Sequence, residues 1–176
     1  MWIIVDGYNL IRQSDALRQY ERISLEEGRR ALLRSLADYR KLRGHRITIV
    51  FDGWEGGSPR EERDRAGSMD IIYSRLGEKA DEVIKRLVAA GSEEILVVTS
   101  DREIAHFAAR RGKASIDSLA FAERIERIAA GPSSDADIPA EEEADEDDRP
   151  VAAKKKGPAR RLSKQKRAEL ARIRKL

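Results

Sequence analysis

The stretch WIIVDGYN at residues 2–9 opens with an apolar run rich in β-branched residues and ends in an aspartate, a glycine, a tyrosine and an asparagine. A short run of this kind is typical of a buried strand in a parallel sheet. Residues 47–51 (ITIVF) and 95–98 (ILVV) repeat the pattern, residues 69–73 (MDIIY) are interpreted as an edge strand, and residues 114–116 (ASI) are a weaker candidate. The chain is therefore expected to form a mainly parallel sheet.

Helical patterns alternate with these runs. Ser24 and Glu27 form a capping box, in which each side chain satisfies a backbone donor of the other residue, and Ser100 and Glu103 form a second one. Apolar residues at helical spacing predict helices from Ser24 to Gly44, from Ala80 to near Gly91, from Ser100 to about Ala108, and from about Asp117 to Ala130. Strands that alternate with helices indicate an α/β fold with a parallel sheet covered on both faces.

The formal net charge of +3 is the sum of three unequal segments. Residues 1–131, interpreted as the folded domain, hold 23 basic and 22 acidic residues. Residues 132–149 are interpreted as a solvated acidic linker with a net charge of −8, and residues 150–176 as a basic tail with a net charge of +10. The tail is expected to be disordered or partly helical, and its charge suits either nonspecific RNA binding or a solubilising extension.

Composition excludes several classes of protein. The chain has no cysteine, which excludes a disulfide scaffold, a thiolate metal site and a cysteine nucleophile. No apolar run approaches the roughly 20 residues of a membrane span, and the early Asp6 does not fit a signal peptide, so a soluble cytoplasmic protein is expected. With only His45 and His106, a histidine acid–base pair is improbable.

Acidic residues follow the three clearest strands, at Asp6, Asp52 and Asp101. Since the carboxyl ends of parallel strands meet at one edge of a sheet, these carboxylates are expected to converge there, joined by Glu78 and Asp81. Crowded carboxylates need a counter-charge, and an all-oxygen set points to Mg²⁺ or Mn²⁺. A single aspartate after a strand is more often a turn residue or helix cap, so the prediction depends on the whole set.

The order of residues after Asp6 adds to this interpretation. Gly7 allows a tight turn, and Asn9 can orient a water molecule or a phosphate oxygen. Tyr8 can stack on a base or fill the core, with the core slightly favoured. Neither a GxGxxG dinucleotide motif nor a GxxxxGK phosphate loop is present.

At these residues the sequence resembles a known family. IIVDGYNL at 3–10, VFDG at 50–53, EKADE at 78–82 and TSD at 99–101 are similar, in order and spacing, to the YacP-like branch of the NYN domain, within the PIN-like nuclease superfamily. The resemblance covers about residues 1–130 and leaves the acidic linker and the basic tail outside the family pattern. It implies a three-layer α/β/α PIN-like (Rossmann-like) sandwich.

The resemblance also implies an activity: metal-dependent endoribonuclease cleavage of RNA by metal-activated water. It further implies that the substrate is mRNA and that the enzyme is associated with the ribosome. By position, Asp6, Asp81 and Asp101 match the family's catalytic acids, and Asp52 and Glu78 match supporting metal positions. One alternative is an RNA-binding or ribosome-associated adaptor with a weak or inactive site, and another is a phosphatase or DNA nuclease that uses the same carboxylates.

Contacts with the substrate are expected from residues around the acids and from the tail. Trp54 lies in a long Gly-rich charged stretch, residues 53–68, and either stacks on an unpaired base or packs on its own loop. The other candidates for substrate or RNA contact are Tyr8, Asn9, Arg75, Lys79, Ser100, Arg102, Lys154, Lys155, Lys156, Arg160 and Arg161. The sequence predicts RNA, either mRNA or rRNA, as the partner and gives no oligomeric state.

Overall fold

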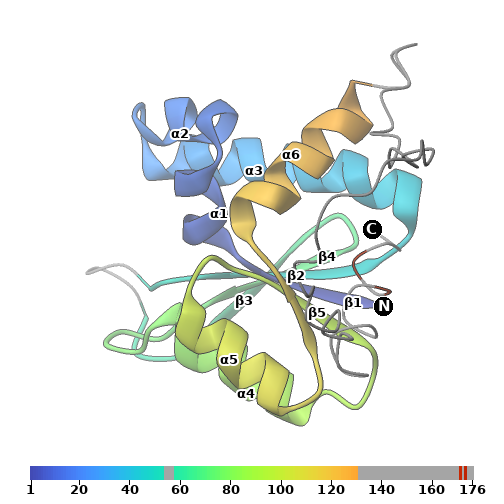
Figure 1. Cartoon of the computed structure of the whole chain (residues 1–176). Helices are drawn as coiled ribbons and strands as arrows, with labels where there is room; N and C mark the ends of the chain where they lie inside the picture. Colours follow the sequence, from blue (N-terminus) through green and yellow to red (C-terminus); the bar gives the residue numbers. More distant parts are fainter. Residues whose placement is uncertain (54–57, 131–170, 172, 174–176) are drawn as a thin grey trace, which may run out of the picture.

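The computed structural model of the chain describes residues 1–53, 58–130, 171 and 173. Within this part, six strands form one sheet in the order β3-β4-β2-β1-β5-β6, and every neighbouring pair is parallel except β3 with β4 (Figure 1). The elements in chain order are β1 (Trp2–Asp6), α1 (Gly7–Gln13), α2 (Asp15–Glu21), α3 (Leu25–Arg43), β2 (Arg46–Phe51), β3 (Glu62–Ala66), β4 (Met69–Tyr73), α4 (Ala80–Ala90), β5 (Ile95–Val98), α5 (Arg102–Arg110), β6 (Ala114–Ile116) and α6 (Ser118–Ala129).

Helices cover both faces of the sheet, as the sequence predicts. Figure 1 shows α1, α2, α3 and α6 on one side and α4 with α5 on the other. Alternate residues of β1 point to opposite sides: Ile3 and Val5 pack with α1, α3 and α6, whereas Trp2 and Ile4 pack with α4 and α5. The expected three-layer α/β fold with a mostly parallel sheet is therefore confirmed.

The first capping box is confirmed in its serine cap only, because the Ser24 N–H donates to the Tyr20 carbonyl oxygen at 3.2 Å and not to the Glu27 side chain. The Ser24 hydroxyl accepts a hydrogen bond from the Glu27 N–H at 3.0 Å, and α3 ends at Gly44, whose φ of 67° is the left-handed conformation of a helix end. For the second capping box, the residue predicted to be the N-cap is wrong. Asp101, and not Ser100, is the N-cap of α5. Serine and aspartate are both good caps, so the pattern SDRE alone does not choose between them.

The interpretation of residues 69–73 as an edge strand is wrong. β4 lies inside the sheet, between β2 and β3, and the edge on that side is β3. The strand β3 falls within the stretch 53–68, which the sequence analysis treated as a charged loop. Its residues are charged and mostly exposed, so no apolar pattern marks it, and it is fixed by a two-residue turn in which Gly67 has a φ of 60°.

Gly7 lies where the chain turns from β1 into α1, directly against Phe51. A Cβ atom at this position would lie 2.3 Å from Phe51 Cε1, far inside van der Waals contact. We expect Gly7→Ala to lower the free energy of unfolding by about 1–2 kcal/mol through overpacking. Chemical denaturation measures this loss, and the double variant Gly7→Ala/Phe51→Leu, compared with Phe51→Leu alone, should show a smaller one. Additive effects would contradict the contact.

Among the helices described, none is long and apolar enough to cross a membrane. The acidic linker and almost all of the basic tail lie outside the described residues. Of the tail, Ala171 and Ile173 are described; both are helical, and Ile173 packs against the core on the α3 side of the sheet.

Candidate active site

The carboxyl ends of the central strands carry aspartates that meet at one edge of the sheet. Asp6 is the last residue of β1, Asp52 follows β2, and Asp101 lies just beyond β5, while Asp81 comes from the first turn of α4. Within the described residues these four aspartates line one pocket of about 220 Å³, together with Tyr8, Asn9, Arg12 and Gln13. We call this cavity the acidic pocket. It lies where open parallel sheets bind their ligands.

Asp6 is the most buried of the four aspartates, with 8% of its surface exposed. Its carboxylate caps α1 by accepting the Asn9 N–H at 3.2 Å, and it accepts the Thr99 hydroxyl at 3.3 Å. Burial raises the pKa of Asp6 to about 6; the bond from Asn9 opposes this shift, and repulsion from Asp81 and Asp52 adds to it. The acidic pocket therefore contains a carboxylate that is costly to ionise.

Asp52 fixes the start of α4. Its Oδ1 accepts the Ala80 N–H at 2.6 Å, and so replaces the side-chain cap that Lys79, the N-cap residue, does not provide. Asp81 is the next residue, so this bond also fixes the backbone from which its carboxylate enters the pocket. Partial burial raises the pKa of Asp81, repulsion from Asp101 and Asp52 adds to the shift, and two nearby lysines oppose it.

Asp101 is held by the helix that it caps. Its carboxylate accepts the N–H groups of Glu103 at 2.6 Å and Ile104 at 3.3 Å. The Asp101 N–H in turn donates to Thr99 Oγ1 at 3.1 Å. Thr99 therefore links the backbone of Asp101 to the carboxylate of Asp6. The sequence analysis did not single out Thr99 as a functional residue, although it stands directly after an apolar strand in the string TSD.

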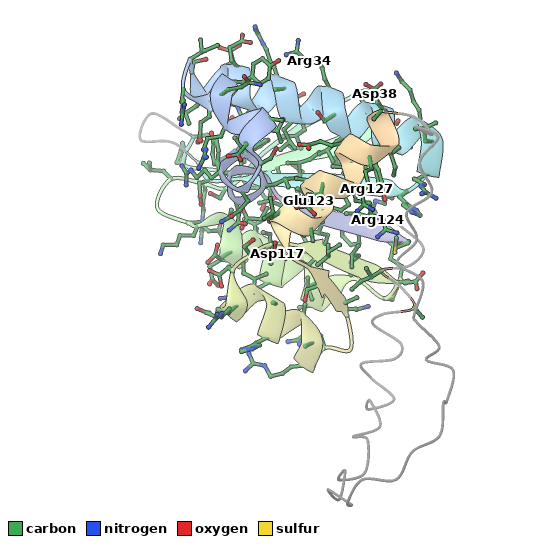
Figure 2. The ribbon with its side chains drawn as sticks, turned by 45° about the horizontal axis from the view of Figure 1, so that its top comes forward. Arg34, Asp38, Asp117, Glu123, Arg124 and Arg127 are labelled. Carbon is green, nitrogen blue, oxygen red and sulfur yellow. The ribbon has the colours of Figure 1, made fainter. Side chains whose placement is uncertain are left out.

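Asn9 was expected to orient a water molecule or a phosphate, but its side-chain oxygen makes two internal bonds. It accepts the Ser100 N–H at 3.0 Å and the Ser118 hydroxyl at 2.8 Å. The Ser100 hydroxyl donates to Asp117 at 2.7 Å, and Figure 2 shows Asp117 at the start of α6. Asn9 and Ser100 thus fasten together α1, the segment after β5 and α6, which form one wall of the site.

The donor set of the acidic pocket fits a hard divalent cation in its chemistry. Carboxylate oxygens are the ligands that Mg²⁺ and Mn²⁺ prefer, and such a cation would relieve the repulsion that raises the pKa values of Asp6 and Asp81. Within the described residues, no three acidic or histidine side chains are close enough together to form a complete metal site. The pocket therefore offers suitable ligands without a preformed coordination shell.

Glu78, an expected metal ligand, does not line the acidic pocket. Its carboxylate pairs with Arg86 at 2.7 Å and with Arg75 at 3.4 Å, and only 11% of its side chain is exposed. Arg86 also pairs with Glu61. Glu78 and the expected substrate contact Arg75 are thus engaged with each other beside α4.

The other expected substrate contacts are in different situations. Tyr8 is mainly a core residue, 7% exposed, with its ring packed edge-on against Phe51 at 5.1 Å, although it also lines the acidic pocket. Lys79 and Arg102 are exposed at the starts of α4 and α5. Trp54 and the tail residues Lys154, Lys155, Lys156, Arg160 and Arg161 lie outside the described residues.

Two further residues of the acidic pocket were not expected from the sequence. Arg12 and Gln13 lie at the end of α1, a short helix that the apolar pattern does not mark. Arg12 pairs with Glu21 at 3.2 Å and lies 5.5 Å from the centre of the Tyr8 ring. It adds a positive charge to a pocket otherwise lined by carboxylates and neutral groups.

Comparison with known proteins relates this chain to one family. Protein YacP of Bacillus subtilis (strain 168) is 33% identical over 104 residues, which are 56% of this chain and 59% of that relative, so the match spans less than two thirds of its length. The crystal structure of Rae1 (YacP) from Bacillus subtilis is 29% identical, with a TM-score of 0.58 over 74% of this chain and 78% of that one. The crystal structure of a mutant of the same protein, also 29% identical, gives a TM-score of 0.58 over 73% of this chain and 79% of that one.

The family model for the YacP-like NYN domain matches residues 3–175. This range exceeds the resemblance over residues 1–130 and includes the acidic and basic segments, which the sequence analysis left outside the family pattern. NYN-domain proteins are associated with nuclease-type functions related to RNA. Because the match covers nearly the whole length of the protein, the chain belongs to the YacP-like NYN domain family.

Proposed function

We propose that the chain is a metal-dependent endoribonuclease and that the acidic pocket is its active site. The observation that carries the proposal is the meeting of four aspartates around one pocket in a chain of the NYN family: Asp6, Asp52 and Asp101 at or just after the ends of β1, β2 and β5, and Asp81 in α4. We further propose that the substrate is mRNA, that the ribosome is a partner, and that the protein acts in the cytoplasm.

In this proposal Asp6, Asp81 and Asp101 would hold Mg²⁺ or Mn²⁺, with Asp52 in support. When bound, such a cation lowers the pKa of a water molecule and offsets the negative charge of the phosphate. The chain's own contribution is to fix the carboxylates. The Asn9 N–H and the Thr99 hydroxyl hold Asp6, and the bond from Ala80 to Asp52 fixes the helix that carries Asp81.

The test is a cleavage assay with the full chain. A labelled single-stranded RNA, a DNA of the same sequence and a small phosphate ester are each incubated with Mn²⁺, with Mg²⁺ or with a chelator. We expect internal cleavage of the RNA alone, only with a divalent cation, giving 5′-phosphate and 3′-hydroxyl ends. RNA that is bound but never cut would favour the adaptor alternative, and preferred cleavage of DNA or of the ester would favour the other enzymes.

A structured mRNA incubated with and without ribosomes extends this test to the partner. Faster or more selective cleavage in the presence of ribosomes would support the proposed ribosome association. Equal rates and equal cleavage sites in both reactions would contradict it, while leaving the proposed nuclease activity intact.

A further inference from the structure

A second pocket, of about 150 Å³, adjoins the acidic pocket and shares Asp52 with it. It lies beyond the carboxyl ends of β2 and β4, and it carries two arginines from distant parts of the chain. We call it the arginine pocket; its lining residues are Arg29, Asp52, Gly53, Ser58, Arg60, Glu62, Tyr73 and Ser74. Because they share Asp52, the two pockets are neighbours at the same edge of the sheet.

Arg29 is held in place by aromatic residues. Its Nη1 donates to the Tyr8 hydroxyl at 2.7 Å, and its guanidinium carbon lies 5.8 Å from the centre of the Tyr73 ring. That ring is itself stacked on Phe51 at 5.6 Å. Within the described residues, Arg29 makes no ion pair with a carboxylate, whereas the neighbouring Arg30 pairs with both Glu26 and Glu27. The Arg29 guanidinium is thus held in one orientation, and no carboxylate among the described residues neutralises its charge.

Arg60 is the second cation of this pocket. Its N–H donates to the Ser58 hydroxyl at 3.2 Å, and among the described residues its guanidinium has no carboxylate partner. The floor below it is tightly built, because a Cβ atom on Gly53 would lie only 2.1 Å from the Ser74 carbonyl oxygen. The Gly53 N–H donates to Ser74 Oγ at 2.8 Å. The cavity therefore has closely packed backbone at Gly53 and Ser74, and its lining carries two arginines and two acidic residues, Asp52 and Glu62.

The charges and the size of the cavity select its occupant. Arginines without carboxylate partners bind phosphate through charge-assisted hydrogen bonds. The volume is well below the ~300–1,000 Å³ of pockets that enclose a drug-sized ligand, so it suits a phosphate group and part of a sugar rather than a whole nucleotide. A contrasting pocket near the starts of β1, β2 and β4 also has three arginines, but each of these pairs with an acid.

We propose that the arginine pocket binds a backbone phosphate of single-stranded RNA next to the one cleaved in the acidic pocket, with Arg29 and Arg60 as the phosphate ligands. This inference rests on the proposed function for its meaning in catalysis, but RNA binding tests it separately. Glu62 and Asp52 oppose the phosphate, because both acidic residues line the same cavity, and a cation held at Asp52 would offset the second charge.

The test measures both cleavage and binding. Loss of one phosphate contact in Arg29→Gln or Arg60→Gln should raise KM and Kd for a single-stranded RNA by about tenfold with kcat nearly unchanged. The slope of log affinity against log salt concentration should fall by ~0.7 per lost contact. Glu62→Gln should tighten binding, and Arg30→Gln, which removes an arginine next to Arg29 but outside the pocket, should leave KM and Kd unchanged.

The outcomes separate the two proposals. If the wild-type protein cleaves RNA while Arg29→Gln and Arg60→Gln leave KM, Kd and the salt slope unchanged, the arginine pocket is not a phosphate site, and the nuclease proposal stands. If the wild-type protein does not cleave RNA but both variants still weaken RNA binding, the pocket remains and the nuclease proposal fails. If Arg29→Gln unfolds because it loses the hydrogen bond to the Tyr8 hydroxyl, the binding and cleavage measurements on Arg60→Gln and Glu62→Gln still test the proposal.

Discussion

Asp81→Asn lowers the rate of RNA cleavage by about a thousandfold, equivalent to ~4 kcal/mol of transition-state stabilisation, and leaves the fold intact. This is the expected result because the Asp81 carboxylate lines the acidic pocket but makes no hydrogen bond within the described part of the chain. Partial burial, together with repulsion from Asp101 and Asp52, already disfavours its charge. The substitution removes a proposed metal ligand without removing a structural contact.

Initial rates of cleavage of a labelled RNA in Mn²⁺, together with thermal unfolding, measure the two effects. Glu82→Gln is the matched control, because Glu82 is the next residue of α4, carries the same charge, is exposed and pairs with the partly buried Lys85. We expect its rate to stay within about twofold of the wild type. Equal rates for Asp81→Asn and wild type would show that the acidic pocket is not the active site.

The strands and their convergence were predictable because each rule involved is local. The runs at 2–5, 47–51 and 95–98 are almost wholly β-branched and apolar, and burial in the middle of a parallel sheet requires that composition. Once the strands are parallel and adjacent, the aspartates that follow them lie at the same edge. The meeting of Asp6, Asp52 and Asp101 thus followed from the fold.

The position of Glu78 could not be predicted from residue spacing alone. With Asp81 three residues away, the two carboxylates would share a face if both were helical, but α4 begins only at Ala80. Glu78 therefore lies in the turn before the helix, where Arg86 and Arg75 bind it. The position of a helix start depends here on Asp52, a residue of another element, and a sequence pattern near Glu78 does not contain that information.

The strand β3 and the helix α1 could not be predicted from the sequence either. Four of the five residues of β3 are charged and exposed, and its extended form comes from pairing with β4 across a tight turn. Arg12 and Gln13 reach the acidic pocket only because Asp6 caps a short helix directly after β1. Tertiary contacts determine these features, and tertiary contacts are not visible in a single sequence.

Asp6 makes the stability of the metal-free protein depend on pH. Burial raises its pKa to about 6 in the folded state, against 3.8 for an ordinary aspartate, so folding favours the protonated form. Such a group stabilises the fold fully below pH ~4 and loses that contribution as pH rises through about 6. The loss by neutral pH is up to about 3 kcal/mol, at ~1.4 kcal/mol per pH unit.

Asp6→Asn removes this titration, because an amide stays neutral at every pH. With a chelator present, we expect the variant to be more stable than the wild type by ~2–3 kcal/mol at pH 7.5, and the difference to vanish near pH 4. Urea denaturation at both pH values measures it, and Asp38→Asn, on the exposed side of α3, controls for the loss of one carboxylate. Parallel stability curves for Asp6→Asn and wild type would contradict the burial argument. Mn²⁺ at pH 7.5 should then stabilise the wild type more than the variant, since it offsets the charge that burial penalises.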